Sequence, residues 1–173
     1  NIKDVTPGVL VRAYQNGRLI CDVGFGSTYA YYDLASLTKI VFTVQAMMHS
    51  FEEGKWNIDT KVSQFLSWYP HKETRITELL NHSSGLEWWR PFYKDLTITD
   101  SWQKRRDSLK KMLIDIGPRV EVENSVYSDI GFLVLGFILE EFYGVDLVTL
   151  WNKMKEQYYP GTTLEFHPRN QTT

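Results

Sequence analysis

The sequence is poor in the residues that build cross-links and metal sites. It contains a single cysteine, Cys21, which excludes an internal disulfide and any multi-cysteine metal site. The four histidines, His49, His71, His82 and His167, show no HxxxH or similar ligand spacing, so a zinc site is not expected. No motif in the chain calls for a metal or for another cofactor, and we expect none.

Strong net charge and long apolar runs are lacking as well. The 173 residues include 19 Lys and Arg against 21 Asp and Glu, a formal net charge of −2. Such a balance gives no electrostatic footprint for nucleic acid and no basic membrane patch. No apolar stretch reaches the length of about 18 residues that predicts a transmembrane segment, and no signal peptide is recognisable. The 43% hydrophobic and 23% charged residues are typical of a globular domain.

Two short strands are predicted at the start of the chain. Residues 8–14 and 18–25 are rich in β-branched and aromatic side chains, and Gln15, Asn16 and Gly17 separate them. Asn-Gly between two such runs favours a hairpin turn because both residues accept a positive φ. We therefore expect an antiparallel hairpin.

Helices dominate the rest of the sequence. Apolar residues recur at three- and four-residue spacing after Ser36, and Gly54 is a natural helix stop. Further helical patterns cover Ile76 to Leu80, residues 98–116, Ile130 to Tyr143 before Gly144, and about 146–158. The fold class we expect is therefore α/β of the α+β type, with a hairpin and a helical subdomain.

Two strands alone make a marginal sheet, since three or more are normally needed for stability. The sequence ends in HPRNQTT, residues 167–173, a polar stretch typical of an unfinished loop. We therefore expect the strands that complete the sheet to lie in a C-terminal segment outside this sequence. That segment is a predicted partner of the chain.

A Ser-x-x-Lys pattern supplies the first candidate for chemistry. Residues at positions i and i+3 share a helix face, so Lys39 can reach the Ser36 hydroxyl. A lysine activates a serine if its own pKa is lowered by burial or by positive charge. The pattern alone is weak, because Ser101–Lys104 and Ser108–Lys111 repeat it in a polar segment. The structural alternative is a helix-capping serine with an extended lysine.

Three further motifs follow Ser36 in order: EGKWNID at residues 53–59, LLNHSSGL at residues 79–86, and YSDIGF at residues 127–132. Together with LASLTK at residues 34–39, they resemble the serine β-lactamase and penicillin-binding protein superfamily. The resemblance is closest to its class C β-lactamase-like group, which is related to D-alanyl-D-alanine carboxypeptidases. It covers nearly all of residues 7–168, as the N-terminal part of that domain.

The resemblance implies a DD-peptidase/β-lactamase-like fold and acyl transfer through a covalent acyl-enzyme. Carried over, Ser36 is the nucleophile, Lys39 shares its proton, and Tyr127 delivers a proton to the leaving group or helps to activate Ser36. The Ser36 backbone N–H is one expected oxyanion donor. His82 belongs to a segment that is mainly structural in the family, and Tyr127 has the alternative of a core tyrosine before a capped helix.

The implied substrates are β-lactams or D-Ala-D-Ala peptides of peptidoglycan, in a periplasmic or secreted bacterial location. The alternatives are an esterase or D-aminopeptidase of the same superfamily, or a non-catalytic binding relative. The implied domain contains a sheet hairpin and loop (1–35), the nucleophile helix (36–54), a helical subdomain (55–158) and a tail (159–173).

Two departures from the family pattern qualify this expectation. Asp129 stands where the family commonly has asparagine, and an ionised carboxylate accepts hydrogen bonds but cannot donate them. Asp129 is therefore expected to attract Lys39 or a cationic group of a substrate. The third motif of the family, Lys-Thr-Gly or His-x-Gly, is absent after Gly131. Its loss removes the second oxyanion donor, which typically costs about a hundredfold in rate.

Overall fold

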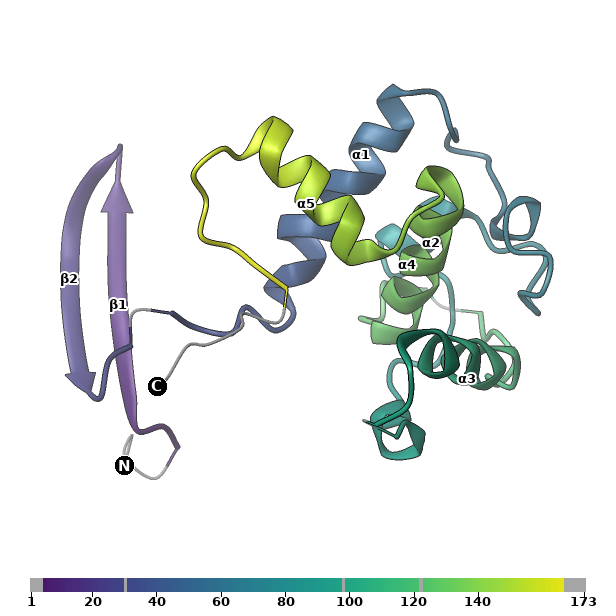
Figure 1. Cartoon of the computed structure of the whole chain (residues 1–173), viewed down its shortest axis with the longest axis horizontal. Helices are drawn as coiled ribbons and strands as arrows, with labels where there is room; N and C mark the ends of the chain where they lie inside the picture. The colour runs from purple at the N-terminus through teal and green to yellow at the C-terminus, as the bar shows by residue number, and fades with distance from the viewer. Residues whose placement is uncertain (1–4, 30, 98, 122, 167–173) are drawn as a thin grey trace. The chain divides into compact units, whose positions relative to one another are not determined.

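The computed structural model describes residues 5–29, 31–97, 99–121 and 123–166 (Figure 1). The chain divides into two compact units, and each is described by itself. The first contains the described residues up to Ala35, and the second runs from Ser36 to Phe166. Of the tail predicted at residues 159–173, residues 167–173 lie outside the described residues.

The first unit contains the predicted hairpin. Strands β1 (Gly8–Gln15) and β2 (Arg18–Gly26) pair antiparallel, with a register shift between Ala13 and Tyr14. Asn16 and Gly17 form the turn with φ angles of 50° and 76°. The Asn-Gly prediction is therefore confirmed, and the left-handed conformation of both residues is the physical reason for it.

The hairpin leaves much of its apolar surface in contact with solvent. Large side chains of both strands are exposed, among them Leu10, Val11, Tyr14, Leu19, Ile20 and Val23. These residues alternate between the two faces of the ribbon, so both faces are affected. A two-stranded ribbon with exposed apolar residues on both faces does not bury enough surface to be stable by itself.

The second unit is helical, and most of its predicted elements are confirmed. It contains the π-helical turn η2 (Lys39–Thr43), α1 (Val44–Glu52), the 3₁₀ turns η3 (Val62–Gln64) and η4 (Phe92–Asp95), α2 (Ile76–Leu80), α3 (Trp102–Ile114), α4 (Asp129–Tyr143) and α5 (Leu147–Tyr158). The helix predicted at 98–116 starts later than expected. Ser101 caps α3 by accepting a hydrogen bond from the Lys104 N–H at 3.2 Å. Residue 98 lies outside the described residues.

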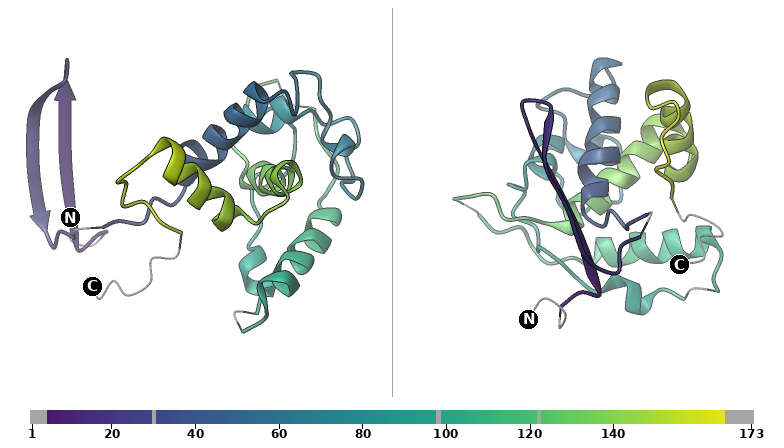
Figure 2. Two further views of the ribbon diagram at one scale, coloured as in Figure 1. Left: turned by 45° about the horizontal axis from the view of Figure 1, so that its top comes forward. Right: turned by 90° about the vertical axis from the view of Figure 1, so that its left-hand side faces the viewer.

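Helix α4 forms the centre of this unit. It packs against α2, α5, α1 and η2, and Figure 2 (left) looks nearly along its axis. Residues 130–132 and 134–139 of the helix are buried. Ser128 caps its first turn by accepting from the Gly131 N–H at 3.2 Å, and Gly144, with a φ of 64°, ends it. The N-terminus of α4 is thus a rigid mount for the residues just before and within its first turn.

Candidate active site

Ser36 lies where the chain enters the helix that leads into η2 and α1. Its carbonyl accepts a hydrogen bond from the Lys39 N–H at 3.1 Å, which closes the first turn. Ala35, immediately before it, has a φ of 43°. An alanine in the left-handed region carries backbone strain, and such strain clusters at functional sites. The turn presents the Ser36 side chain on the surface.

Lys39 and Tyr127 converge on the Ser36 hydroxyl from distant parts of the sequence. Lys39 Nζ donates to Ser36 Oγ at 3.2 Å, as the i, i+3 spacing predicts. Tyr127 OH donates to the same oxygen at 2.9 Å across 91 residues of sequence. The structure therefore brings the three predicted catalytic residues together around one oxygen.

Asp129 joins the cluster through Lys39. Its Oδ1 lies 2.7 Å from Lys39 Nζ, and the exposed fractions of the Lys39 and Asp129 side chains are 17% and 36%. The ammonium also lies 5.1 Å from the centre of the Tyr127 ring and 5.7 Å from that of Phe132. Lys39 is thus held by one carboxylate and two aromatic faces.

The surroundings of Lys39 favour its charged form. Burial disfavours its charge, but hydrogen bonds and charge attraction from Asp129 and Tyr127 outweigh that effect and raise the Lys39 pKa above its usual value. The condition under which a lysine activates a serine, a lowered pKa, is therefore not met while Asp129 and Tyr127 contact Lys39 in this way. Lys39 and Tyr127 both donate to Ser36 Oγ, so neither is positioned as a free base until one loses its proton.

The segment 82–88 positions the residues around Tyr127. The Val126 N–H donates to the His82 carbonyl and the Asp129 N–H to the Trp88 carbonyl, each at 2.9 Å. Ser128 adds a bond from its hydroxyl to the Glu87 carbonyl at 3.0 Å. Residues 126–129 are therefore fixed on both sides of Tyr127. The LLNHSSGL motif marked this segment in the sequence, but its backbone pairing left no separate signal.

The same segment also anchors the chain that leads to Tyr127. The Val120 N–H donates to the Gly85 carbonyl at 2.9 Å, and Arg119 bonds the Ser84 carbonyl and the Glu78 carboxylate. Gly85 has a φ of 67°, and a Cβ there would lie 1.9 Å from the Val120 oxygen. Only glycine allows this close approach of the two backbones.

His82 contacts Tyr127 through its ring and Ser128 through its nitrogen. The ring lies 4.7 Å from Tyr127 and 5.2 Å from Phe132, centre to centre. Its Nδ1 accepts from the Ser128 N–H at 3.1 Å, which requires the neutral form. Burial lowers the His82 pKa first, and the charge of Lys39 lowers it further against a smaller opposing effect of Asp129. These contacts suit a positioning role for His82.

We expect the His82–Ser128 contact to make stability depend on pH. Since the folded-state pKa of His82 lies below the ordinary histidine value of about 6.5, the unfolded chain binds more protons near that pH. The stabilisation is fully present above pH 6.5 and is lost as the pH falls through the lower folded-state pKa. Urea unfolding between pH 5 and 8 measures this. His82→Asn keeps an acceptor and tolerates the φ of 60°, but does not titrate. An unchanged pH profile in that variant would contradict the assignment.

The other two Ser-x-x-Lys pairs do not form such a cluster. Lys104 Nζ bonds Asp100 Oδ1 at 2.8 Å, and the Ser101 hydroxyl caps α3. In the described part of the chain, no side-chain hydrogen bond joins Ser108 to Lys111. Among the three pairs, all of which the structure describes, only that of Ser36 combines the pattern with a hydrogen bond from a tyrosine.

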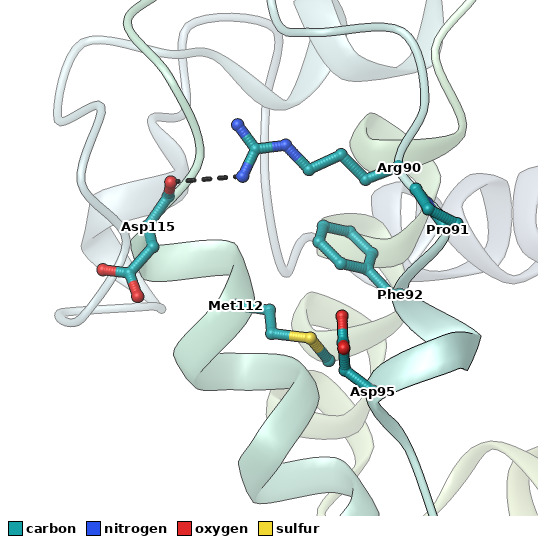
Figure 3. Close-up of a pocket in the computed structure, with 6 residues that line it drawn as sticks. All are labelled: Arg90, Pro91, Phe92, Asp95, Met112 and Asp115. Carbon is teal, nitrogen blue, oxygen red and sulfur yellow. Dashed lines mark hydrogen bonds between the residues drawn. The ribbon is translucent and has the colours of Figure 1, made fainter.

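A shallow pocket lies elsewhere in the helical unit. Figure 3 shows its lining residues, Arg90, Pro91, Phe92, Asp95, Met112 and Asp115. Its volume is about 180 Å³, below the roughly 300 Å³ at which ligand pockets begin. Arg90 already bonds the Glu87 carboxylate and the Asp115 carbonyl. The pocket includes none of the residues around Ser36.

The third family motif has no counterpart among the described residues. The strands there are β1 and β2, and neither contains Lys-Thr-Gly or His-x-Gly. The helices found in the described residues include none long and apolar enough to cross a membrane.

Comparison with known proteins gives a consistent family. The model of the beta-lactamase family matches residues 2–150. An N-acetylmuramyl-L-alanine amidase of Bacillus subtilis is 27% identical over 168 residues, covering 82% of this chain and 38% of the relative. Penicillin-binding protein 4* of the same species is 28% identical over 125 residues, covering 68% of this chain and 26% of the relative.

Solved structures show the same fold. A class C beta lactamase superposes with a TM-score of 0.66 at 22% identity, covering 90% of this chain and 45% of that one. The octameric penicillin-binding protein homologue from Pyrococcus abyssi gives 0.62 at 22% identity, with 90% and 40% covered. The predicted β-lactamase-like fold is therefore confirmed. The chain spans less than half the length of these relatives.

Proposed function

Since this chain belongs to the beta-lactamase family, we propose that it contributes the nucleophile of a serine acyl hydrolase, with Ser36 as that nucleophile. The observation that most supports the proposal is the double contact to the Ser36 hydroxyl. Lys39 Nζ and Tyr127 OH lie 3.2 and 2.9 Å from one serine oxygen. A serine hydroxyl is weak at neutral pH and needs such neighbours to become reactive.

In the proposed reaction, Ser36 Oγ attacks the substrate carbonyl and forms an acyl-enzyme. Lys39 takes the Ser36 proton once it has itself lost one, and Tyr127 passes a proton to the leaving group. Water then attacks the ester and releases the acyl group. The Ser36 N–H is one proposed oxyanion donor. His82 and the segment 82–88 hold Tyr127 in place.

We propose β-lactams or D-Ala-terminated peptidoglycan peptides as the substrates, in a periplasmic or secreted bacterial location. The similarity to penicillin-binding protein 4* and to an N-acetylmuramyl-L-alanine amidase supports this substrate class. An esterase or D-aminopeptidase is the second candidate. The observation that favours it is Asp129, which cannot donate to a substrate carbonyl as an asparagine does. Asp129 is the proposed substrate contact in either case.

A further segment of the same protein is proposed to complete the domain. The hairpin β1–β2 exposes apolar side chains on both faces, and additional strands paired along its edges would extend it to a sheet large enough for other elements to pack on. That segment would also supply the second oxyanion donor. Residues 1–173 are then the N-terminal part of one β-lactamase-like domain.

Labelling of Ser36 by a penicillin tests the proposal. The protein that contains this chain and its completing segment is incubated with benzylpenicillin and a reactive p-nitrophenyl ester, and its intact mass is measured. We expect a covalent acyl adduct that peptide mapping places on Ser36 and that Ser36→Ala abolishes. Ser108→Ala, which removes a serine of the same Ser-x-x-Lys pattern, should leave labelling unchanged. Absence of both an adduct and any Ser36-dependent hydrolysis of the two reagents would overturn the nucleophile assignment.

A further inference from the structure

The Asp129 carboxylate has one oxygen engaged and one free. Its Oδ1 is buried and lies 2.7 Å from Lys39 Nζ. The side chain as a whole is 36% exposed, so its solvent-accessible part includes the other oxygen, Oδ2. Within the ranges that the structure describes, no hydrogen bond or ion pair reaches Oδ2. The site therefore presents an unoccupied carboxylate oxygen close to the nucleophile.

We propose that Asp129 selects substrates with a protonated amine on the carbon next to the scissile carbonyl, and that this amine replaces Lys39 as the counter-ion of Asp129. The inference rests on the proposed function, since it assumes that Ser36 is the nucleophile. It decides for the second candidate of the proposed function, and it assigns the substrate class as amino-acid amides and esters with a free α-amine rather than β-lactams or N-acylated peptides.

The distances allow one substrate to reach both groups. Asp129 Oδ1 is 2.7 Å from Lys39 Nζ, which is itself 3.2 Å from Ser36 Oγ, so the carboxylate lies within about 6 Å of the nucleophile. A reacting carbonyl carbon sits about 3 Å from the attacking oxygen. An α-ammonium is two bonds from that carbon, so a substrate bound at Ser36 can direct it towards the carboxylate and reach hydrogen-bonding range.

The charges around Lys39 explain why such an amine would matter for reaction as well as binding. Lys39 faces Ser36 and the rings of Tyr127 and Phe132, Asp129 is its only counter-ion among the described residues, and His82 is held neutral nearby. A substrate ammonium on Oδ2 adds a second cation to one carboxylate. The charge balance is restored when Lys39 releases its proton to solvent, and neutral Lys39 can then act as the base.

The acylation step then balances. The Ser36 Oγ–H proton passes to neutral Lys39 Nζ while the Oγ–C bond forms and the carbonyl electron pair moves to its oxygen. When that pair returns, the bond from carbon to the leaving amine breaks. The Tyr127 hydroxyl protonates the leaving nitrogen, and Lys39 returns a proton to Tyr127. Lys39 ends neutral, Tyr127 ends protonated, and the substrate ammonium is unchanged.

Paired substrates test the proposal in the protein that contains this chain and its completing segment. The probes are D- and L-alanine p-nitroanilide with a free amine, each compared with its N-acetyl form. For the enantiomer that is turned over faster, we expect kcat/KM of the free-amine substrate to exceed that of its N-acetyl form by at least about tenfold. The reason is that a substrate ammonium at this distance shifts the pKa of Lys39 by one unit or more. The acid limb of the kcat profile should also lie at lower pH for the free-amine substrate.

Variants separate recognition by Asp129 from a general structural role. Asp129→Asn should lose most of the kcat/KM preference for the free-amine substrate and most of the difference in the acid limb of the kcat profile. Asp129→Glu should retain part of both effects. Asp107→Asn removes an exposed carboxylate from α3 and should change neither. Circular dichroism confirms that each variant is folded. Ser36→Ala should abolish turnover of every probe.

The outcomes distinguish this inference from the proposed function. Ser36-dependent turnover of the N-acetyl substrates without a free-amine preference would overturn the role of Asp129 and leave the nucleophile assignment intact. An equal loss of kcat/KM on the free-amine and N-acetyl substrates in Asp129→Asn would also overturn the role of Asp129. Absence of Ser36-dependent turnover for any amide, ester or β-lactam would overturn both.

Discussion

Replacing Lys39 with methionine is expected to slow acylation of Ser36 by about a thousandfold, within the range of about 10²–10⁴ for loss of a positioned proton-transfer group. Methionine keeps the length and apolar stem of the side chain but cannot donate to Ser36 Oγ at 3.2 Å or carry its proton. It also leaves Asp129 without the cation at 2.7 Å. Burst kinetics with a chromogenic ester or β-lactam, in the protein with its completing segment, measures the acylation rate.

The chain supplies a matched control for this substitution. Lys104 stands in the same Ser-x-x-Lys spacing, but its ammonium pairs with Asp100 and makes no contact with Ser101 Oγ in the described structure. Lys104→Met should therefore leave acylation unchanged. An acylation rate in Lys39→Met within threefold of the wild type would contradict a proton-transfer role for Lys39.

Local signals in the sequence predicted the hairpin and the main helices. Asn16-Gly17 specified the turn because its backbone requires positive φ at both positions, and Gly144 ended α4 for the same reason. The contact between Lys39 and Ser36 also followed from helix geometry alone, since the two residues are three apart. These features depend on a few neighbouring residues, so one sequence is enough to predict them.

Features that depend on distant residues could not be predicted in the same way. The contact of Tyr127 with Ser36 was expected only from the family resemblance, because 91 residues separate the two. The direction of the Lys39 pKa could not be predicted from the sequence, since it depends on the balance between burial and the contacts of Lys39 with Asp129 and Tyr127. The pairing of Val120 with Gly85 left no signal, because backbone hydrogen bonds between irregular segments have no periodic pattern.

Gly85 is the position where a single methyl group is expected to damage both the fold and the site. Its φ of 67° disfavours alanine, and the added Cβ would lie 1.9 Å from the Val120 oxygen. The two segments must therefore separate, which breaks the bond from the Val120 N–H to the Gly85 carbonyl. We expect Gly85→Ala to lower the free energy of unfolding by about 3 kcal/mol or more, since backbone strain and the steric clash act together.

Gly54 isolates the steric part of that effect. It has a similar φ of 71° but open space around its Cβ position, so Gly54→Ala carries backbone strain alone. That variant should cost about 1 kcal/mol in urea unfolding. The acylation rate should differ as well. Gly85→Ala should slow acylation about a hundredfold, because a shift of about 1 Å in Tyr127 misplaces its hydroxyl, whereas Gly54→Ala should leave the acylation rate unchanged. Equal losses of stability and activity in the two variants would show that the approach of Gly85 to Val120 does not hold Tyr127 in place.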